Sequence, residues 1–266
     1  MKPGKSFPES ELPIELVDIP TVDGPLAGAV HLPSLIPASV VVCCHGLLSS
    51  KDSDKFITIG KEFSRNGVAV VRFDFSGCGA SNALLVSSLI HSRIRDLRAV
   101  LDFVSRQPWA NGITGLLGSS FGGYLALLAA ASEPERLNAV VCWATPFDLE
   151  KIKLDPKESE NLRNCFPPGF ELGSPTSLRG LSPVSRVFVI HGKRDETVSW
   201  QDALDIYDCS SDPKRLLIME NVEHRFIDLS SRRLALRLSL EWFISHGFGA
   251  ESAGWMADRR NEDGSH

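Results

Sequence analysis

The sequence predicts an α/β fold in which helices cover both faces of a mostly parallel, eight-stranded sheet. Three observations lead to this prediction: apolar runs rich in β-branched residues, amphipathic segments between them, and a length that suits one large domain. The chain has 266 residues, of which 43% are hydrophobic and 23% are charged, as in ordinary globular proteins. Strands that are apolar on both faces and alternate with helices are typical of parallel sheets, because parallel neighbours need a crossover connection.

The first two predicted strands form an antiparallel hairpin. Residues 14–20 and 25–33 are short patterned runs, and Asp23-Gly24 between them favours a turn. Six further apolar runs predict strands at 39–44, 68–75, 113–117, 137–143, 185–190 and 214–219. Helical spacing of apolar residues predicts helices at 51–65, 88–106, 120–132, 198–208 and 229–245.

Two regions interrupt this alternation. Residues 147–184 are charged and then rich in Pro and Gly, which predicts a small lid inserted over the sheet. Residues 247–266 are polar and lack periodicity, so we expect a disordered tail there. Residues 1–246 are therefore interpreted as one domain that includes the lid.

Composition and charge argue against several classes of protein. The net charge of −5 and the pI near 5.8 disfavour nucleic acid or an anionic membrane as the main partner. No apolar run reaches the roughly 18 residues of a membrane span, and residues 1–13 lack the apolar core of a signal peptide. We therefore expect a cytoplasmic protein without stable membrane insertion.

The six cysteines do not suggest a disulfide framework or a metal site. Cys43, Cys44 and Cys142 lie in apolar strands, where a thiol behaves as a small hydrophobic group. No Cys-x-x-Cys pair occurs, so zinc binding and redox chemistry have little support. We expect neither a metal nor another cofactor.

Residues 118–122 (GSSFG) match the pattern Gly-x-Ser-x-Gly, and only Ser120 can occupy its serine position. A predicted strand precedes this run and an Ala/Leu-rich helix follows it. A strand, a tight turn and a helix in this order hold a serine hydroxyl at the carboxyl edge of the sheet. The glycines let backbone segments pass closely at the turn. Ser120 is therefore the candidate nucleophile.

A serine nucleophile needs a base and an acid that orients the base. In folds with such a turn, these groups follow later strands, in the chain order Ser, Asp or Glu, His. Asp195 follows the next-to-last predicted strand, and His224 follows the last one. The alternatives are Glu196 and Asp148 for the acid, and His191 and His45 for the base, although each of these histidines ends a strand in a His-Gly pair.

Acyl transfer also needs donors for the negative oxygen of the transition state. The backbone N–H of Phe121, directly after Ser120, is one candidate. The loop after the strand at 39–44 is expected to supply the other. In that loop His45-Gly46 shapes the turn, and the N–H of Leu47 is the predicted donor.

Five segments together resemble the α/β-hydrolase superfamily: HGLLSSK, DFSGCGAS, GSSFGG, HGKRDETV and VEHRF. The resemblance spans residues 12–245 and is greatest to small serine esterases related to dienelactone hydrolases, prolyl oligopeptidases and feruloyl esterases. In those relatives an Asp-x-x-Gly-x-Gly-x-Ser segment shapes the loop after the second parallel strand, and here Asp74 to Ser81 keeps that frame. Cys78 stands where those relatives often have histidine.

The GCGAS segment also resembles part of a dinucleotide-binding loop. Asn82 occupies the place of the third glycine in that motif, which argues against nucleotide binding. Dienelactone hydrolases carry a cysteine nucleophile, whereas Ser120 points to ester hydrolysis through an acyl-serine.

The resulting prediction is a serine carboxylesterase that acts on a small-molecule ester. An acyl-thioesterase or a small peptidase with the same triad is the alternative, followed by a non-catalytic scaffold that binds a small molecule or a partner. The oligomeric state is not predicted.

Aromatic residues near the predicted lid suggest an apolar substrate pocket. Trp143, Phe166 and Phe170 would line it if they faced Ser120, and would otherwise pack the lid onto the body. The basic residues that could bind a coenzyme phosphate are Lys151, Lys153, Lys157 and Arg163.

Overall fold

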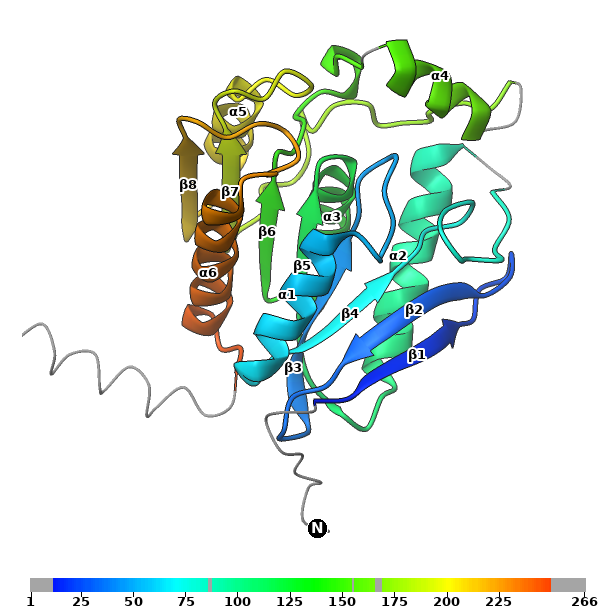
Figure 1. Ribbon diagram of the computed structural model, residues 1–266, viewed down its shortest axis with the longest axis vertical. Helices are drawn as coiled ribbons and strands as arrows, with labels where there is room; N and C mark the ends of the chain where they lie inside the picture. Colours follow the sequence, from blue (N-terminus) through cyan, green and yellow to red (C-terminus); the bar gives the residue numbers. More distant parts are fainter. Residues whose placement is uncertain (1–11, 86–87, 155, 166–168, 250–266) are drawn as a thin grey trace, which may run out of the picture.

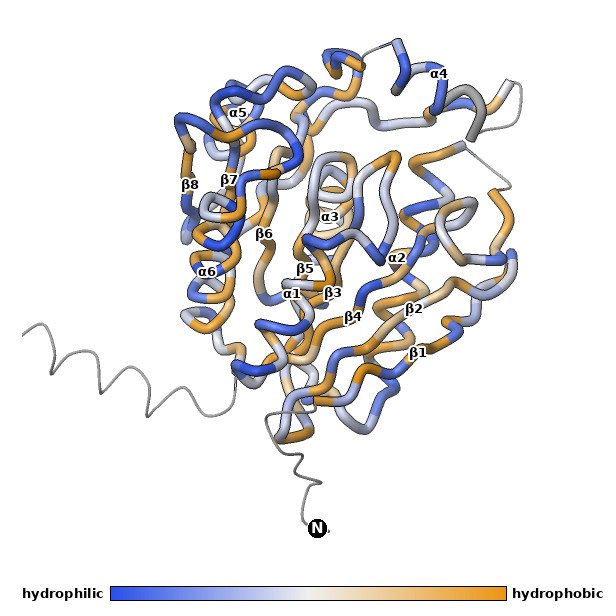
Figure 2. The backbone as a smooth tube through the Cα atoms, in the orientation of Figure 1, coloured by the Kyte–Doolittle hydropathy of each residue, from blue (hydrophilic) through white to orange (hydrophobic). Residues whose placement is uncertain are grey.

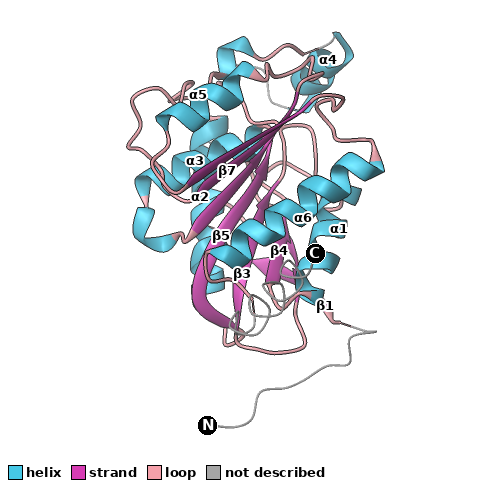
Figure 3. Ribbon diagram, turned by 90° about the vertical axis from the view of Figure 1, so that its left-hand side faces the viewer, coloured by secondary structure: helices cyan, strands magenta, loops and turns pink. Residues whose placement is uncertain are grey.

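The computed structural model describes residues 12–85, 88–154, 156–165 and 169–249. Within these residues, one eight-stranded sheet has the order β1-β2-β4-β3-β5-β6-β7-β8, with helices on both faces (Figure 1, Figure 3). The strands are β1 (Ile14–Ile19), β2 (Leu26–His31), β3 (Ala38–Cys44), β4 (Ala69–Phe73), β5 (Ala110–Ser119), β6 (Ala139–Trp143), β7 (Val187–Gly192) and β8 (Lys214–Met219). Pairing is antiparallel between β1 and β2 and between β2 and β4, and parallel in the remaining pairs. The predicted fold class is confirmed, including the N-terminal hairpin.

The helices follow the predicted alternation with one addition. They are α1 (Asp54–Arg65), α2 (Leu89–Ser105), α3 (Phe121–Ser132), α4 (Pro156–Cys165), α5 (Gln201–Cys209) and α6 (Leu229–Ser245), with short 3₁₀ turns η2 (Pro134–Arg136) and η3 (Leu149–Lys151). The helix α4 was not predicted, because its sequence PKESENLRNC has no stripe of apolar residues to mark a helical period.

Alternate residues of the central strands face two separate layers of the core. In β3, Val41 and Cys43 pack in the layer under α1 and α6, whereas Val40, Val42 and Cys44 pack in the layer under α2, α3 and α5. This division follows from the period of two in a strand. In Figure 2 the central strands carry mainly hydrophobic residues, whereas α4 is largely hydrophilic.

The segment between β6 and β7 lies beyond the carboxyl ends of the strands (Figure 1). It is attached to the body by bonds from two helices: the Tyr124 hydroxyl of α3 donates to the Pro175 carbonyl at 2.7 Å, and Leu89 N–H of α2 donates to the Glu171 carbonyl at 3.0 Å. The position above the sheet is the one expected for residues 147–184. Their action as a lid stays a prediction.

The chain remains packed for three residues beyond the expected domain boundary at 246. The Phe248 side chain is fully buried beside Phe243, and Gly249 N–H donates to Ser39 Oγ at 2.9 Å. The rest of the predicted disordered tail, residues 250–266, lies outside the described residues. No helix in the described part of the chain is both long and apolar enough to cross a membrane.

Candidate active site

Ser120 lies on the sharp turn between β5 and α3. Its backbone has φ 55° and ψ −126°, a conformation that is strained for any residue other than glycine. Its N–H donates to the Trp143 carbonyl at 2.8 Å, which ties the turn to the neighbouring strand. A Cβ atom on Gly118 would overlap the backbone of Gly122, and one on Gly122 would overlap the Cys44 carbonyl. Both glycines of the motif are therefore sterically required.

A continuous set of hydrogen bonds connects Ser120, His224 and Asp195. His224 Nε2 lies 3.1 Å from Ser120 Oγ, and His224 Nδ1 lies 2.7 Å from Asp195 Oδ2. The Asp195 side chain is fully buried, whereas that of His224 is 19% exposed. The other carboxylate oxygen accepts from Thr197 N–H at 2.9 Å and from Val198 N–H at 2.8 Å. The structure thus brings together the three predicted residues, each placed by the loop after a strand.

His191, an alternative base in the sequence, also contacts Asp195. Its Nε2 lies 3.1 Å from Asp195 Oδ2 and 3.1 Å from the Val198 carbonyl. Because both partners accept, Nε2 carries the proton. His191 is fully buried and does not line the cavity above Ser120. His191 contacts Asp195 on the side away from the cavity and orients its carboxylate.

The Asp195 carboxylate is held in its charged form. Burial raises the pKa of Asp195, but hydrogen bonds from His191 and His224 outweigh burial and lower this pKa to about 2. At neutral pH the carboxylate is therefore ionised and faces two imidazole rings. The alternative acid Asp148 instead accepts from Glu150 N–H at 3.1 Å and lies outside the cavity.

The two predicted oxyanion donors border the same cavity. Leu47 follows β3, and Phe121 is the first residue of α3; both line the space over Ser120. Among the described residues, neither N–H donates to a backbone carbonyl. A Cβ atom on Gly46 would lie 3.4 Å from Ser120 Cβ, so the loop after β3 passes directly beside the nucleophile turn.

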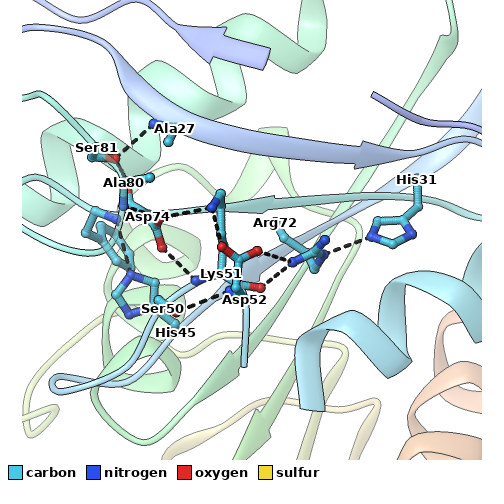
Figure 4. Close-up of polar contacts among 11 residues, drawn as sticks. Ala27, His31, His45, Ser50, Lys51, Asp52, Arg72, Asp74, Ala80 and Ser81 are labelled. Carbon is cyan, nitrogen blue, oxygen red and sulfur yellow. Dashed lines mark hydrogen bonds and ion pairs between the residues drawn. The ribbon is translucent and has the colours of Figure 1, made fainter. Parts of the chain in front are cut away.

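A cluster of polar side chains, all buried except the exposed Asp52, supports this loop (Figure 4). We call it the Asp74 network, and it consists of His31, Lys51, Asp52, Arg72 and Asp74. Asp74 accepts from Lys51 N–H at 2.6 Å and from Ala80 N–H at 2.9 Å, and it pairs with Lys51 Nζ at 3.3 Å. Arg72 donates to the Lys51 carbonyl and to His31 Nε2, the latter at 2.8 Å. The network fixes the loop that carries Leu47 to the end of β4.

His45 connects the same two loops. Its Nε2 accepts from Phe75 N–H at 3.2 Å, and its Nδ1 donates to the Gly46 carbonyl at 2.8 Å. Burial and the nearby Arg93 charge lower the pKa of His45 to about 3, so the ring is neutral and one nitrogen accepts. His45 therefore positions these two loops and does not lie where a base for Ser120 would be needed.

The cavity over Ser120 has a volume of about 470 Å³. Its walls combine apolar groups, including Leu48, Ile152 and Leu154, with cationic ones. The cations are Lys55, Arg225 and Arg232. Sequence reasoning missed Lys55 and Arg232 because they lie on α1 and α6, far apart in the chain, and no local pattern marks them. Arg225 lies in the loop between β8 and α6, directly after His224. The suggested lysines Lys151 and Lys153 do not line the cavity.

The structure corrects the predicted aromatic pocket. Trp143 is fully buried in the layer under α1 and α6, where it packs on Phe226 at 5.1 Å and donates to Ser239 Oγ at 3.0 Å. Its alternating position on β6 turns it away from the cavity. Phe170 packs against the opposite core layer and does not line the cavity either. Phe166 lies outside the described residues.

Comparisons with known proteins identify the family. Residues 39–171 match the family model described as alpha/beta hydrolase fold. The chain is similar to palmitoyl-protein thioesterase ABHD10, mitochondrial, of Rattus norvegicus, with 26% identity over 220 residues, 74% of this chain and 72% of that protein. Among solved structures it resembles dienelactone hydrolase from Anabaena variabilis, with a TM-score of 0.65 and 20% identity over 89% of this chain and 99% of that one. It also resembles the esterase PF2001 of Pyrococcus furiosus, with a TM-score of 0.71 and 20% identity over 92% of this chain and 96% of that one. The chain therefore belongs to the α/β-hydrolase fold family.

Proposed function

We propose that the protein is a serine hydrolase that cleaves small carboxylic esters through an acyl-serine intermediate. One observation carries this proposal: Ser120, His224 and Asp195 form an unbroken hydrogen-bonded series whose hydroxyl end meets the cavity. A neutral imidazole within hydrogen-bond distance of a serine hydroxyl activates it as a nucleophile.

In the proposed reaction, His224 Nε2 takes the proton of Ser120 as Oγ attacks the ester carbonyl. The N–H groups of Leu47 and Phe121 stabilise the oxyanion, and Asp195 stabilises the imidazolium. The alcohol leaves with the proton from His224. Water then attacks the acyl-serine by the same route, which releases the acid and restores Ser120.

Acyl-thioester hydrolysis is the second candidate. The rat relative, named a palmitoyl-protein thioesterase, favours it, and the same catalytic groups serve both ester types. The assays described below also distinguish the remaining alternatives. A peptidase would cleave the amide substrate, and a non-catalytic scaffold would show no turnover that depends on Ser120. The cytoplasmic location stays a prediction, and the rat relative carries the description mitochondrial.

Labelling with a fluorophosphonate, read by peptide mass spectrometry, tests the nucleophile. We expect the label on Ser120, and a loss of at least about 10⁴-fold in hydrolysis of p-nitrophenyl acetate for Ser120→Ala. Ser119→Ala is the matched control, because it removes the adjacent hydroxyl, and it should still be labelled. Label on Ser119, or full activity in Ser120→Ala, would contradict the proposal. Rates with matched oxyester, thioester and amide substrates would then decide among the chemistries.

A further inference from the structure

Two cationic side chains line the wall of the same cavity. Lys55 comes from the first turn of α1, and Arg232 comes from the first turn of α6. Burial is the main cause that lowers the pKa of Lys55, and the Arg232 charge lowers it further. Two like charges have therefore been brought together beside a candidate nucleophile, although the whole chain carries a net charge of −5.

Within the described residues, neither cation forms an ion pair. Lys55 Nζ donates to the neutral Ser119 hydroxyl at 2.6 Å, and Arg232 Nε donates to the Phe226 carbonyl at 2.8 Å. Glu223 raises the pKa of Lys55 from a distance, but its carboxylate accepts from Ile227 N–H. The positive charge of the pair thus remains uncompensated by a directly bonded carboxylate.

Lys55 is also close to the reacting centre and poorly solvated. Its ammonium group binds the hydroxyl of Ser119, the residue directly before Ser120. Burial, followed by the Arg232 charge, lowers the pKa of Lys55 to about 8. An anion placed between the two cations would replace the lost hydration and form charge-assisted hydrogen bonds, which are stronger than neutral ones.

We propose that Lys55 and Arg232 bind an anionic group, a carboxylate or a phosphate, that the substrate carries in addition to the carbonyl attacked by Ser120. This inference rests on the proposed function and names its substrate class. The substrates are esters or thioesters with a charged acyl chain, or with a charged alcohol or thiol.

Substrate pairs that differ in charge test this proposal. Mono-p-nitrophenyl adipate and p-nitrophenyl hexanoate place a carboxylate or a methyl group at the end of equal acyl chains. The hexanoates of 4-hydroxybenzoate, its ethyl ester and 4-hydroxyphenyl phosphate place the charge on the leaving group instead. We expect kcat/KM to favour the anionic member at least tenfold in one series, which identifies the charged side of the substrate and the kind of anion.

Variants of the two cations connect the preference to its cause. Lys55→Met and Arg232→Met should each lower the ratio of anionic to neutral kcat/KM by about 10- to 100-fold, as expected for a lost charge-assisted hydrogen bond. Lys61→Met and Arg233→Met are matched controls, because they remove exposed cations from the same two helices outside the cavity. These controls should leave the ratio within about twofold. Thermal unfolding of all four variants checks that the fold is retained.

A charge ratio near one in the native protein, or an unchanged ratio in both cavity variants, would overturn the inference. An equal loss of kcat/KM for the anionic and the neutral substrate of a pair would mean that Lys55 and Arg232 act only on the structure. That result would also overturn the inference. Calorimetry of monomethyl adipate and methyl hexanoate with Ser120→Ala protein separates this result from a failure of the proposed function. Anion binding that needs Lys55 and Arg232, without Ser120-dependent turnover, would support the site and refute the hydrolase.

Discussion

Two polar networks at the same edge of the sheet contain similar groups but have different surroundings. The proposed triad joins the buried Asp195 to His224, and it ends on a serine hydroxyl that borders a cavity. The Asp74 network also holds a buried carboxylate and a histidine, but Asp74 ends on backbone N–H groups (Figure 4). A histidine and a carboxylate in one cluster therefore do not mark an active site. The difference lies in access to a cavity and in a partner that can react.

In the Asp74 network, His31 is neutral, which allows its ring to accept a hydrogen bond in the core. Burial, followed by the charges of Arg72 and Lys61, lowers the pKa of His31 to about 4. The neutral ring can then accept from Arg72 Nε at 2.8 Å. His31 is 1% exposed, so this histidine acts as a fixed acceptor, whereas His224 must exchange a proton in the proposed reaction.

The largest expected effect comes from changing the acid of the proposed triad. Asp195→Asn should lower kcat/KM by about 10⁴-fold, because the amide favours the wrong tautomer of His224 and cannot stabilise an imidazolium. Asp148→Asn, which changes the alternative acid outside the cavity, should stay within about twofold of the native protein. Hydrolysis of p-nitrophenyl acetate measures both, and similar losses in the two variants would refute the assignment of the acid.

Breaking the other network should damage the fold more than the chemistry. Asp74→Asn leaves Lys51 Nζ without its buried partner, and we expect a loss of about 3 kcal/mol in the free energy of unfolding. The exposed pair of Glu62 and Arg65 supplies the control, since Glu62→Gln should cost less than about 1 kcal/mol. Urea unfolding measures both changes. A larger relative loss of kcat/KM than in Asp195→Asn would assign Asp74 to the chemistry instead.

The smallest expected effect is on the pH dependence of the free energy of unfolding. It distinguishes His31, which stays neutral in the fold, from His224, which must exchange a proton in the proposed reaction. The folded-state pKa of His31, about 4, lies below the ordinary value of 6.5, so the unfolded chain binds more protons between these two pH values. The stability contributed by neutral His31 is present above pH 6.5 and is lost as the pH falls towards 4, by at most about 3 kcal/mol.

His31→Gln keeps an acceptor for Arg72 but cannot titrate. Its free energy of unfolding should therefore fall less steeply than that of the native protein between pH 6.5 and pH 4.5. Other buried histidines, such as His45, contribute equally to both proteins and cancel in the difference. Parallel slopes in urea unfolding at several pH values would show that His31 does not titrate in this way.

Local patterns explain which parts of this molecule could be predicted. The strand–turn–helix around Ser120 and the chain order of Asp195 and His224 are properties of short segments and of one topology, so the three residues met as expected. Trp143 was misplaced because an apolar strand buried on both faces gives no sign of which residue faces which layer. Lys55 and Arg232 became neighbours only through the packing of α1 beside α6, which no spacing in the sequence encodes.

The packed end of the chain has a consequence for synthesis. Gly249 bonds to Ser39, 210 residues earlier in the sequence, and the Phe248 ring lies against Gly115 of β5. A nascent chain can therefore close this corner of its core only after nearly all of the described residues have left the ribosome. Until then β5 stays uncovered at Gly115. A chain cut at residue 246 would lack Phe248, and a permanent cavity would remain where its ring packs.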